Sequence, residues 1–327
     1  MKFIVCGSGS WGTAVAVHLA RMGHELLLVP RSEEKAKIMR ECRENVYYLP
    51  HIPFPDKLHV DTRCNEYIGT CDALFVACPM KGLVDLCALL KTGCSKDLWI
   101  ISLIKGLDHA TLRTPSDIIA QFFPENPIAC LSGPTYAVEF ALGKPAAMVL
   151  ASRNPYLEPL QKAISSAHMR VYRSSDLMGV ETASCLKNIY AFGAGILDGL
   201  ELGDNAKSAY LTRALKEMAY LGCALGGQKE TFYGLSGLGD LIATSQGIWS
   251  RNRTFGELLA KGRSVESLTK ELMVEGYGSL RGYHALANKM QIEVPILQGL
   301  HDILYNQRPL DAAVHNLLSR PLKNEFE

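Results

Sequence analysis

The sequence predicts an α/β domain with a doubly wound parallel sheet, followed by an all-α domain. Up to about residue 176, short runs that are apolar throughout alternate with helix-like stretches. This alternation is typical of a parallel sheet with helices on both faces. Beyond that point, long Ala-, Leu- and Gly-rich stretches have helical periodicity and contain no convincing strand. We therefore expect an N-terminal domain over residues 1–176 and a helical domain over residues 177–327.

The individual elements follow from the same patterns. The predicted strands are Lys2–Cys6, Glu25–Val29, Ala73–Cys78, Leu98–Leu103, Ile128–Leu131, Ala147–Ala151 and Arg170–Tyr172. Trp11–Met22 has helical spacing and stops before Gly23, a residue type common after helix C-termini. The helices predicted in the second half are Gly179–Leu197, Ser208–Leu225, Val265–Leu272, Gly278–Met290, Ile296–Tyr305 and Leu310–Leu318.

Composition excludes several classes of protein. The chain has 327 residues, of which 48% are hydrophobic, and its 34 basic and 33 acidic residues leave a formal charge of +1. A near-neutral chain lacks the general phosphate attraction of a nucleic-acid-binding protein. No apolar run approaches the roughly 20 residues that span a bilayer. The N-terminus begins with a strand-like run instead of a signal peptide. We expect a cytoplasmic protein that neither binds nucleic acid nor inserts into a membrane.

The sequence predicts no metal site. Its ten cysteines occur singly, without a C-x-x-C pair, and its nine histidines form no H-E-x-x-H motif. In a cytosolic chain we expect the cysteines to be reduced thiols, mainly small core residues.

A glycine-rich turn follows the first predicted strand. Gly7, Gly9 and Gly12 fit the pattern G-x-G-x-x-G, with a strand before it and a helix after it. In a Rossmann-like domain these glycines allow a tight turn, close approach of the backbone to a diphosphate, and helix–strand packing. The sequence therefore predicts a bound dinucleotide. Arg31 follows the second strand, where an arginine accommodates the 2′-phosphate of NADP and an acidic residue favours NAD. We favour NADPH, with a solvent-facing Arg31 as the alternative.

Two lysines stand in unusual places. Lys105 follows a predicted strand at the sheet edge where ligands bind in open α/β folds, although a surface lysine is an equal alternative. Lys187 lies within an apolar, small-residue helix between Ala183 and Ala191, which leaves room for a small molecule. Desolvation there would disfavour the charged form and make Lys187 a plausible proton shuttle. Alternatively, it could extend outward or pair with a carboxylate.

A third unusual stretch has glycines at 234, 237 and 239 around Asp240, followed by Ser250-Arg251-Asn252-Arg253. The arginine fork and the amide suit phosphate oxygens. The alternative is a flexible loop beside a helix over Phe255–Lys261, capped by Asn252 or Thr254.

Together these motifs resemble one family, the NAD(P)-dependent sn-glycerol-3-phosphate dehydrogenases of the bacterial type. The resemblance runs from about residue 2 to about residue 320. It rests on the Gly7–Gly12 turn, Ile104-Lys105-Gly106, Leu186-Lys187-Asn188, Gly237-Leu238-Gly239-Asp240 and Ser250–Arg253. It implies reversible hydride transfer between NAD(P)H and dihydroxyacetone phosphate, giving sn-glycerol 3-phosphate for glycerophospholipid synthesis. Helical C-terminal domains of this plan often pair, so we also expect a homodimer.

The resemblance also implies residue roles. Lys187 would be the catalytic proton donor and acceptor. Substrate contacts would come from Lys105, Gly133, Thr135, Asn188, Asp240, Ser250, Arg251 and Asn252. Cofactor contacts would come from Gly7, Gly9, Ser10, Trp11, Gly12, Arg31, Lys105, Ala137, Arg251 and Glu275. Thr135 stands where serine is usual, and the stretch after Glu275-Gly276 departs from the family pattern.

Two other readings remain open. One is a two-domain reductase of a hydroxyacyl or keto-acid substrate, although no His–Glu pair accompanies Lys187-Asn188. The other is a non-catalytic NADPH-binding regulator.

Overall fold

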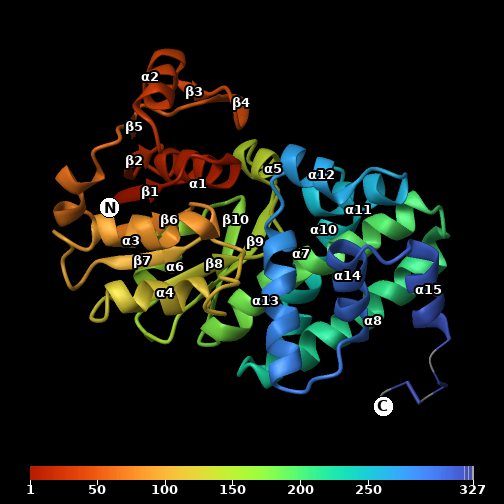
Figure 1. Ribbon diagram of the computed structural model, residues 1–327. Helices are drawn as coiled ribbons and strands as arrows, with labels where there is room; N and C mark the ends of the chain where they lie inside the picture. Colours follow the sequence, from red (N-terminus) through yellow and green to blue (C-terminus); the bar gives the residue numbers. More distant parts are fainter. Residues whose placement is uncertain (320, 323, 326–327) are drawn as a thin grey trace.

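The computed structural model describes residues 1–319, 321–322 and 324–325 and has the predicted class of fold (Figure 1). A mixed β-sheet flanked by helices forms the N-terminal part, and a cluster of packed helices forms the C-terminal part. The last sheet strand ends at Ser174, and the long helix α7 begins at Leu177.

The main sheet has eight strands in the order β10-β9-β8-β7-β6-β1-β2-β5. β1 lies inside the sheet, with Phe3 opposite both Leu26 of β2 and Ala73 of β6. The strands are β1 (Lys2–Cys6), β2 (Glu25–Val29), β5 (Leu58–Val60), β6 (Ala73–Val76), β7 (Trp99–Ser102), β8 (Ile128–Ser132), β9 (Ala146–Ala151) and β10 (Met169–Ser174). Two further short strands, β3 (Glu44–Asn45) and β4 (Leu49–Pro53), form a separate antiparallel pair.

The expectation of a wholly parallel sheet is wrong at one edge. β8 pairs with β9 in antiparallel fashion, and β10 runs parallel to β9. Between β8 and β9 lies only the short helix α5 (Ala137–Ala141), followed by Gly143 at φ +77°. A left-handed glycine there lets the chain turn back. Apolar strands have the same residue pattern in either direction when both faces are covered, so the sequence could not show this reversal.

Helices cover the sheet and position its loops. Those of the N-terminal part are α1 (Ser10–Arg21), α2 (Glu33–Cys42), α3 (Leu83–Leu90), α4 (Pro115–Phe122), α5 and α6 (Glu158–Ile164). Ser32 caps α2, its hydroxyl accepting from Lys35 N at 3.5 Å. Short 3₁₀ turns occupy Cys64–Glu66, Ile68–Thr70 and Met80–Gly82.

Helix α7 (Leu177–Gly199) is the centre of the helical part and is buried along most of its length. Asp176 caps its first turn. Around it lie α8 (Gly203–Ala224), α9 (Lys229–Tyr233), a π-helical turn (Leu235–Gly239), α10 (Asp240–Gln246), α11 (Arg251–Ala260), α13 (Glu275–Lys289) and α14 (Pro295–Asn306). Helix α12 (Val265–Glu271) packs on α11, and α15 (Leu310–Leu318) packs on α14.

Helix α11 begins earlier than the capped helix expected from Asn252 or Thr254. It starts at Arg251, because the hydroxyl of Ser250 accepts a hydrogen bond from Arg253 N at 3.2 Å and caps the helix. Glycine lets α11 pack closely on α7, since a Cβ on Gly195 would lie 1.9 Å from the Arg253 carbonyl oxygen. This contact fixes the start of α11 against α7.

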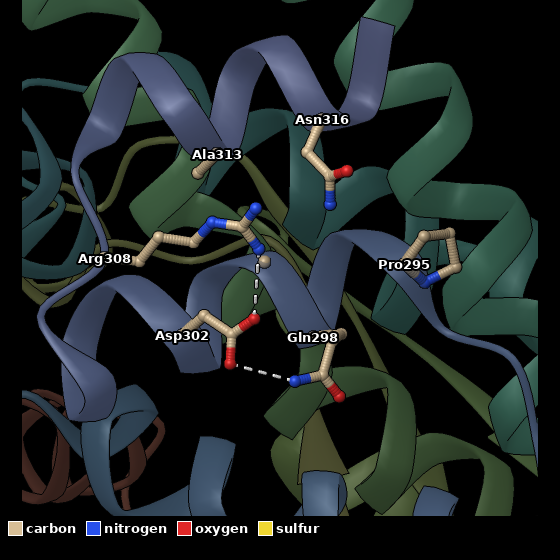
Figure 2. A pocket seen from close by; sticks show the side chains of 7 residues that line it. Pro295, Gln298, Asp302, Arg308, Ala313 and Asn316 are labelled. Atoms are coloured by element: carbon tan, nitrogen blue, oxygen red, sulfur yellow. Dashed lines mark hydrogen bonds and ion pairs between the residues drawn. The ribbon is translucent and has the colours of Figure 1, made fainter. Parts of the chain in front are cut away.

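Within residues 1–319, 321–322 and 324–325, each helix is too short or too polar to span a lipid bilayer. A small cavity of about 90 Å³ lies between α14 and α15 (Figure 2). Its charged groups are paired with each other, with Arg308 3.5 Å from Asp302, which also accepts from Gln298 at 3.0 Å. We assign no ligand to it.

Candidate active site

The glycine-rich turn is closely packed at two of its glycines and open at the third. Gly7 has φ +118°, and a Cβ there would lie 2.6 Å from the backbone of Ala77. A Cβ on Gly12 would lie 2.1 Å from the Gly7 carbonyl oxygen, so helix α1 packs directly on the turn. A Cβ on Gly9, in contrast, would meet nothing within 4 Å. Gly9 is also the N-cap of α1 and brings no side-chain cap, which leaves first-turn N–H groups available to an anion.

Other predicted cofactor residues lie in the same part of the structure. The hydroxyl of Ser10 donates to the Tyr48 carbonyl at 2.7 Å. The Trp11 ring packs on Phe140 at 5.3 Å, and its Nε1 is buried without a partner among the described residues. Arg31 is exposed after β2. Ala137 is the first residue of α5.

The three unusual stretches meet at one carboxylate. Lys187 Nζ lies 2.9 Å from Oδ1 of Asp240, and Lys105 Nζ lies 2.6 Å from Oδ2 of the same side chain. Lys105 also donates to the Gly133 carbonyl at 3.2 Å. Lys187 and Asp240 are only 6% and 2% exposed. Lys187 is therefore buried and paired, and the reading in which it extends into solvent is wrong.

Burial and charge shift the pKa values of this cluster. Burial lowers the pKa of Lys187 to about 8; Asp240 opposes that shift and Lys105 reinforces it. Burial alone would raise the pKa of Asp240, but the Lys105 and Lys187 ammonium groups outweigh it and hold the pKa below its ordinary value. An ionised carboxylate thus lies beside an ammonium group that can exchange a proton near neutral pH.

Thr244 completes the surroundings of Lys187 and was not among the predicted residues. Lys187 Nζ lies 2.5 Å from its hydroxyl, which also lies 3.2 Å from Asp240 Oδ1. Thr244 follows Asp240 by one helical turn of α10, so a D-x-x-x-T spacing was the available signal. Tyr136, also not predicted, donates its hydroxyl hydrogen to the Ala243 carbonyl and ties the β8–α5 loop to α10.

Two asparagines form the next part of the site. Asn252 Nδ2 donates to Asn188 Oδ1 at 3.0 Å. The Oδ1 atom of Asn252 is buried and has no partner among the described residues. A Cβ on Gly276 would lie 2.9 Å from this oxygen and 2.9 Å from the backbone carbonyl oxygen of Asn188, so α13 begins close against both residues. Asn252 thus offers an acceptor to a hydroxyl-bearing ligand.

The remaining predicted residues make fewer hydrogen bonds to other residues of the site. Ser250 is buried and caps α11. Arg251 is exposed, and no hydrogen bond ties it to a described residue. Gly133 has φ +153° and packs on Ala147 and Met148. The Thr135 hydroxyl lies 3.3 Å from the Gly133 carbonyl.

Glu275 joins the start of α13 to the strand-end loops. A Cβ on Gly106 would lie 3.4 Å from its Oε2. Burial raises the pKa of Glu275, while the positive charges of Arg251 and Lys81 oppose the shift. Arg251 therefore lies within electrostatic range of Glu275, on the side of the Lys105–Gly106 loop.

No three His, Cys, Asp or Glu side chains among the described residues come together as a metal site. The predicted residues instead converge where β1, β7 and β8 end, which is the ligand-binding edge of open α/β sheets.

Comparison with known proteins gives one consistent family. Residues 2–157 match the model of the N-terminus of NAD-dependent glycerol-3-phosphate dehydrogenase, and residues 176–315 match the model of its C-terminus. The glycerol-3-phosphate dehydrogenase [NAD(P)+] of Thermoanaerobacter sp. is 38% identical over 100% of this chain and 99% of its own length. The enzyme of the same name from Fusobacterium nucleatum is also 38% identical, over 100% and 99% of the two chains.

A solved structure supports the same assignment. The crystal structure of glycerol-3-phosphate dehydrogenase from Coxiella burnetii has a TM-score of 0.93 and 34% identity, covering 98% of this chain and 99% of that one. These likenesses extend over both the sheet and the helical part, and they confirm the resemblance found in the motifs. The chain belongs to the NAD-dependent glycerol-3-phosphate dehydrogenase family.

Proposed function

We propose that this chain interconverts dihydroxyacetone phosphate and sn-glycerol 3-phosphate by hydride transfer with NAD(P)H. Its family membership and the glycine-rich turn support the cofactor. The observation that carries the proposal is the buried cluster in which Lys105 and Lys187 share the carboxylate of Asp240. The cluster lies at the sheet edge where both ligands would meet.

In this proposal Lys187 holds and transfers the proton. A bound nicotinamide would supply the hydride, as in other enzymes that use this cofactor. As the ketone of dihydroxyacetone phosphate is reduced, negative charge develops on its oxygen, and the Lys187 ammonium stabilises the charge and then donates a proton to it. In the oxidation direction the neutral amine accepts the hydroxyl proton. Asp240 and Thr244 hold Nζ in place.

The remaining residues orient the substrate. Lys105 adds a second positive charge beside the reacting end, and Asn188 and Asn252 present amide groups to the substrate. Ser250 and Arg251, at the start of α11, bind the phosphate, with Gly133 and Thr135 lining the same pocket. The binding energy of the phosphate positions the carbonyl.

We further propose a preference for NADPH, because Arg31 is exposed after β2 and no acidic residue precedes it at that strand end. The cofactor contacts extend to Gly7, Gly9, Ser10, Trp11, Gly12, Ala137 and Glu275, with Lys105 and Arg251 shared by both ligands. The comparison of NADPH and NADH in wild type and in Arg31→Asp tests this. An unchanged ratio of kcat/KM values would remove Arg31 from the proposal.

Three broader expectations belong to the same proposal. The product would supply the backbone of glycerophospholipids, the enzyme would be cytoplasmic, and the domains would divide at residues 176/177. We also propose a homodimer formed through the helical part, which exposes Tyr220, Ile248 and Trp249 by 58%, 77% and 54%. Light scattering of the purified chain tests the last point, and a monomer at micromolar concentration would contradict it.

The activity itself is tested by following NADPH absorbance with dihydroxyacetone phosphate. The control substrates are a hydroxyacyl thioester and a 2-keto acid, which the alternative two-domain reductases would use. We expect turnover with the phosphorylated ketone alone. Turnover with a control substrate in its place would contradict the proposal, and cofactor binding without any turnover would favour a regulator.

A further inference from the structure

A cavity of about 260 Å³ lies in the N-terminal part, away from the residues of the proposed mechanism. It is enclosed by the C-terminal end of α1, by α5 with the loop after it, and by the loop between α6 and β10. Its volume is slightly below the range of about 300–1,000 Å³ that is usual for drug-sized ligands. It therefore suits a small organic molecule.

The floor of this cavity is apolar. Phe140 and Met169 line it and are 6% and 1% exposed. Met22 and Ala167 add apolar surface nearer its opening. An apolar body of a few carbons placed there would remove these side chains from water, which favours binding.

The rim of the cavity is cationic. Arg21 uses one guanidinium nitrogen to donate to the Ala141 carbonyl, and its other nitrogens have no partner among the described residues. Lys144 is paired with Glu139 at 2.9 Å. His168 lies exposed at the same rim, and the side chains that line the cavity include no Asp or Glu. Arg21 is thus a cation with free donors in the lining of a cavity that also has apolar surface, which suits a carboxylate or a phosphate.

The cavity is physically connected to the glycine-rich turn. The Phe140 ring lies 4.8 Å from the His18 ring and 5.3 Å from the Trp11 ring. Phe140 is on α5, the helix that begins with Ala137, a proposed cofactor contact. A ligand that contacts Phe140 would therefore affect Trp11 and Ala137, which are both proposed cofactor contacts.

We propose that this cavity is a binding site for a small amphipathic anion, with its apolar body on Phe140 and its carboxylate or phosphate on Arg21. Occupancy of the site changes the affinity of the glycine-rich turn for the cofactor through Phe140, Trp11 and α5. The two binding equilibria are coupled, so the effect is reciprocal.

Calorimetric titration of the full chain tests the binding. The probes are hexyl phosphate, hexanoate, inorganic phosphate and hexanol. We expect hexyl phosphate and hexanoate to bind, and the one that binds more tightly identifies the preferred head group. We expect inorganic phosphate and hexanol to bind at least about tenfold more weakly. Arg21→Gln should weaken the binding of the anions by about tenfold or more. The matched control is Arg170→Gln, an exposed arginine that does not line the cavity, and it should leave binding unchanged.

A second variant separates this cavity from the cofactor and substrate sites. Ala167→Phe fills the opening with a ring at an exposed position, so the fold should tolerate it. In wild type, saturating hexyl phosphate should change the Kd of NADPH at least threefold, and in Ala167→Phe it should not. If Ala167→Phe binds the anions as tightly as wild type does, the proposal is overturned. A Kd of NADPH that is the same with and without the anion in wild type would also overturn it. Neither readout depends on turnover, so failure of the proposed reaction would be recognised separately.

Discussion

Lys187 Nζ lies 2.9 Å from Oδ1 of Asp240, and both side chains are almost entirely removed from solvent. A buried ion pair of this kind contributes little net stability, because desolvation offsets most of the attraction. We propose that the pair is arranged for proton transfer. Burial lowers the pKa of the ammonium into the range where proton exchange is useful, and the carboxylate keeps part of the population charged.

The pH dependence of the reaction follows from this pKa. In the proposed mechanism, oxidation of sn-glycerol 3-phosphate uses neutral Lys187 as the proton acceptor, so its rate should rise with pH through about 8. Reduction of dihydroxyacetone phosphate needs the ammonium, and its rate should fall over the same interval. Profiles of kcat/KM in both directions check this. Parallel profiles, with both rates rising together, would be inconsistent with a single lysine in both roles.

Asp240→Asn should damage the reaction through Lys187. Because Asp240 raises the pKa of Lys187, its loss should move the inflection of the pH profile to lower pH. It also leaves two ammonium groups close together without a carboxylate, so we expect kcat to fall by a factor on the order of 100. Thr244→Ser keeps the hydroxyl and is the control, with a nearly normal profile. An Asp240→Asn profile that inflects where wild type does would show that the carboxylate does not tune the lysine.

Two glycines of the phosphate turn should respond differently to alanine. Gly12→Ala places a Cβ 2.1 Å from the Gly7 carbonyl oxygen and should lower the free energy of unfolding by about 1–3 kcal/mol or more. Gly9→Ala meets no protein atom within 4 Å, so its stability should stay close to wild type while its Kd for NADPH rises at least about tenfold. Thermal unfolding and cofactor titration of both variants measure these effects. Equal cofactor affinity in Gly9→Ala and wild type would place the diphosphate elsewhere.

Arg251 should act on substrate binding more than on the chemical step. It is exposed at the start of α11 and carries no hydrogen bond to a described residue, so Arg251→Ala should leave stability nearly unchanged. We expect kcat/KM for dihydroxyacetone phosphate to fall at least about tenfold, mainly through KM. Arg253→Ala should instead lower the free energy of unfolding, because Arg253 Nε lies 2.5 Å from Asp198. Intact kcat/KM in Arg251→Ala would remove the phosphate role.

Much of this arrangement could be predicted from the sequence. β1 and β2 have the predicted bounds, because their apolar runs end at Gly7 and at Pro30. Lys105, Lys187 and Asp240 each stood out because a charge in an apolar or glycine-rich stretch needs a local reason. Their convergence on one carboxylate could not be read from the sequence, since it depends on how α7 and α10 pack against the sheet.

Other features of the structure could not be predicted from the sequence pattern. Thr244 looks like any threonine in a helix until the fold brings it to Lys187. The reversal at β9 depends on the conformation of Gly143, and the short pair β3–β4 lies in a stretch without clear periodicity. The motif resemblance predicts a substrate contact for Ser250, whose hydroxyl also caps α11. One side chain can do both, because the oxygen accepts while the hydrogen remains free to donate.

Turnover of Lys187→Ala in the reduction of dihydroxyacetone phosphate, measured together with its Kd for NADPH, decides whether Lys187 carries the proton. We predict that kcat falls by a factor of about 100 to 10,000 while the Kd stays within about threefold of wild type. Near-normal turnover in this variant, with the fold and cofactor binding intact, would contradict the account.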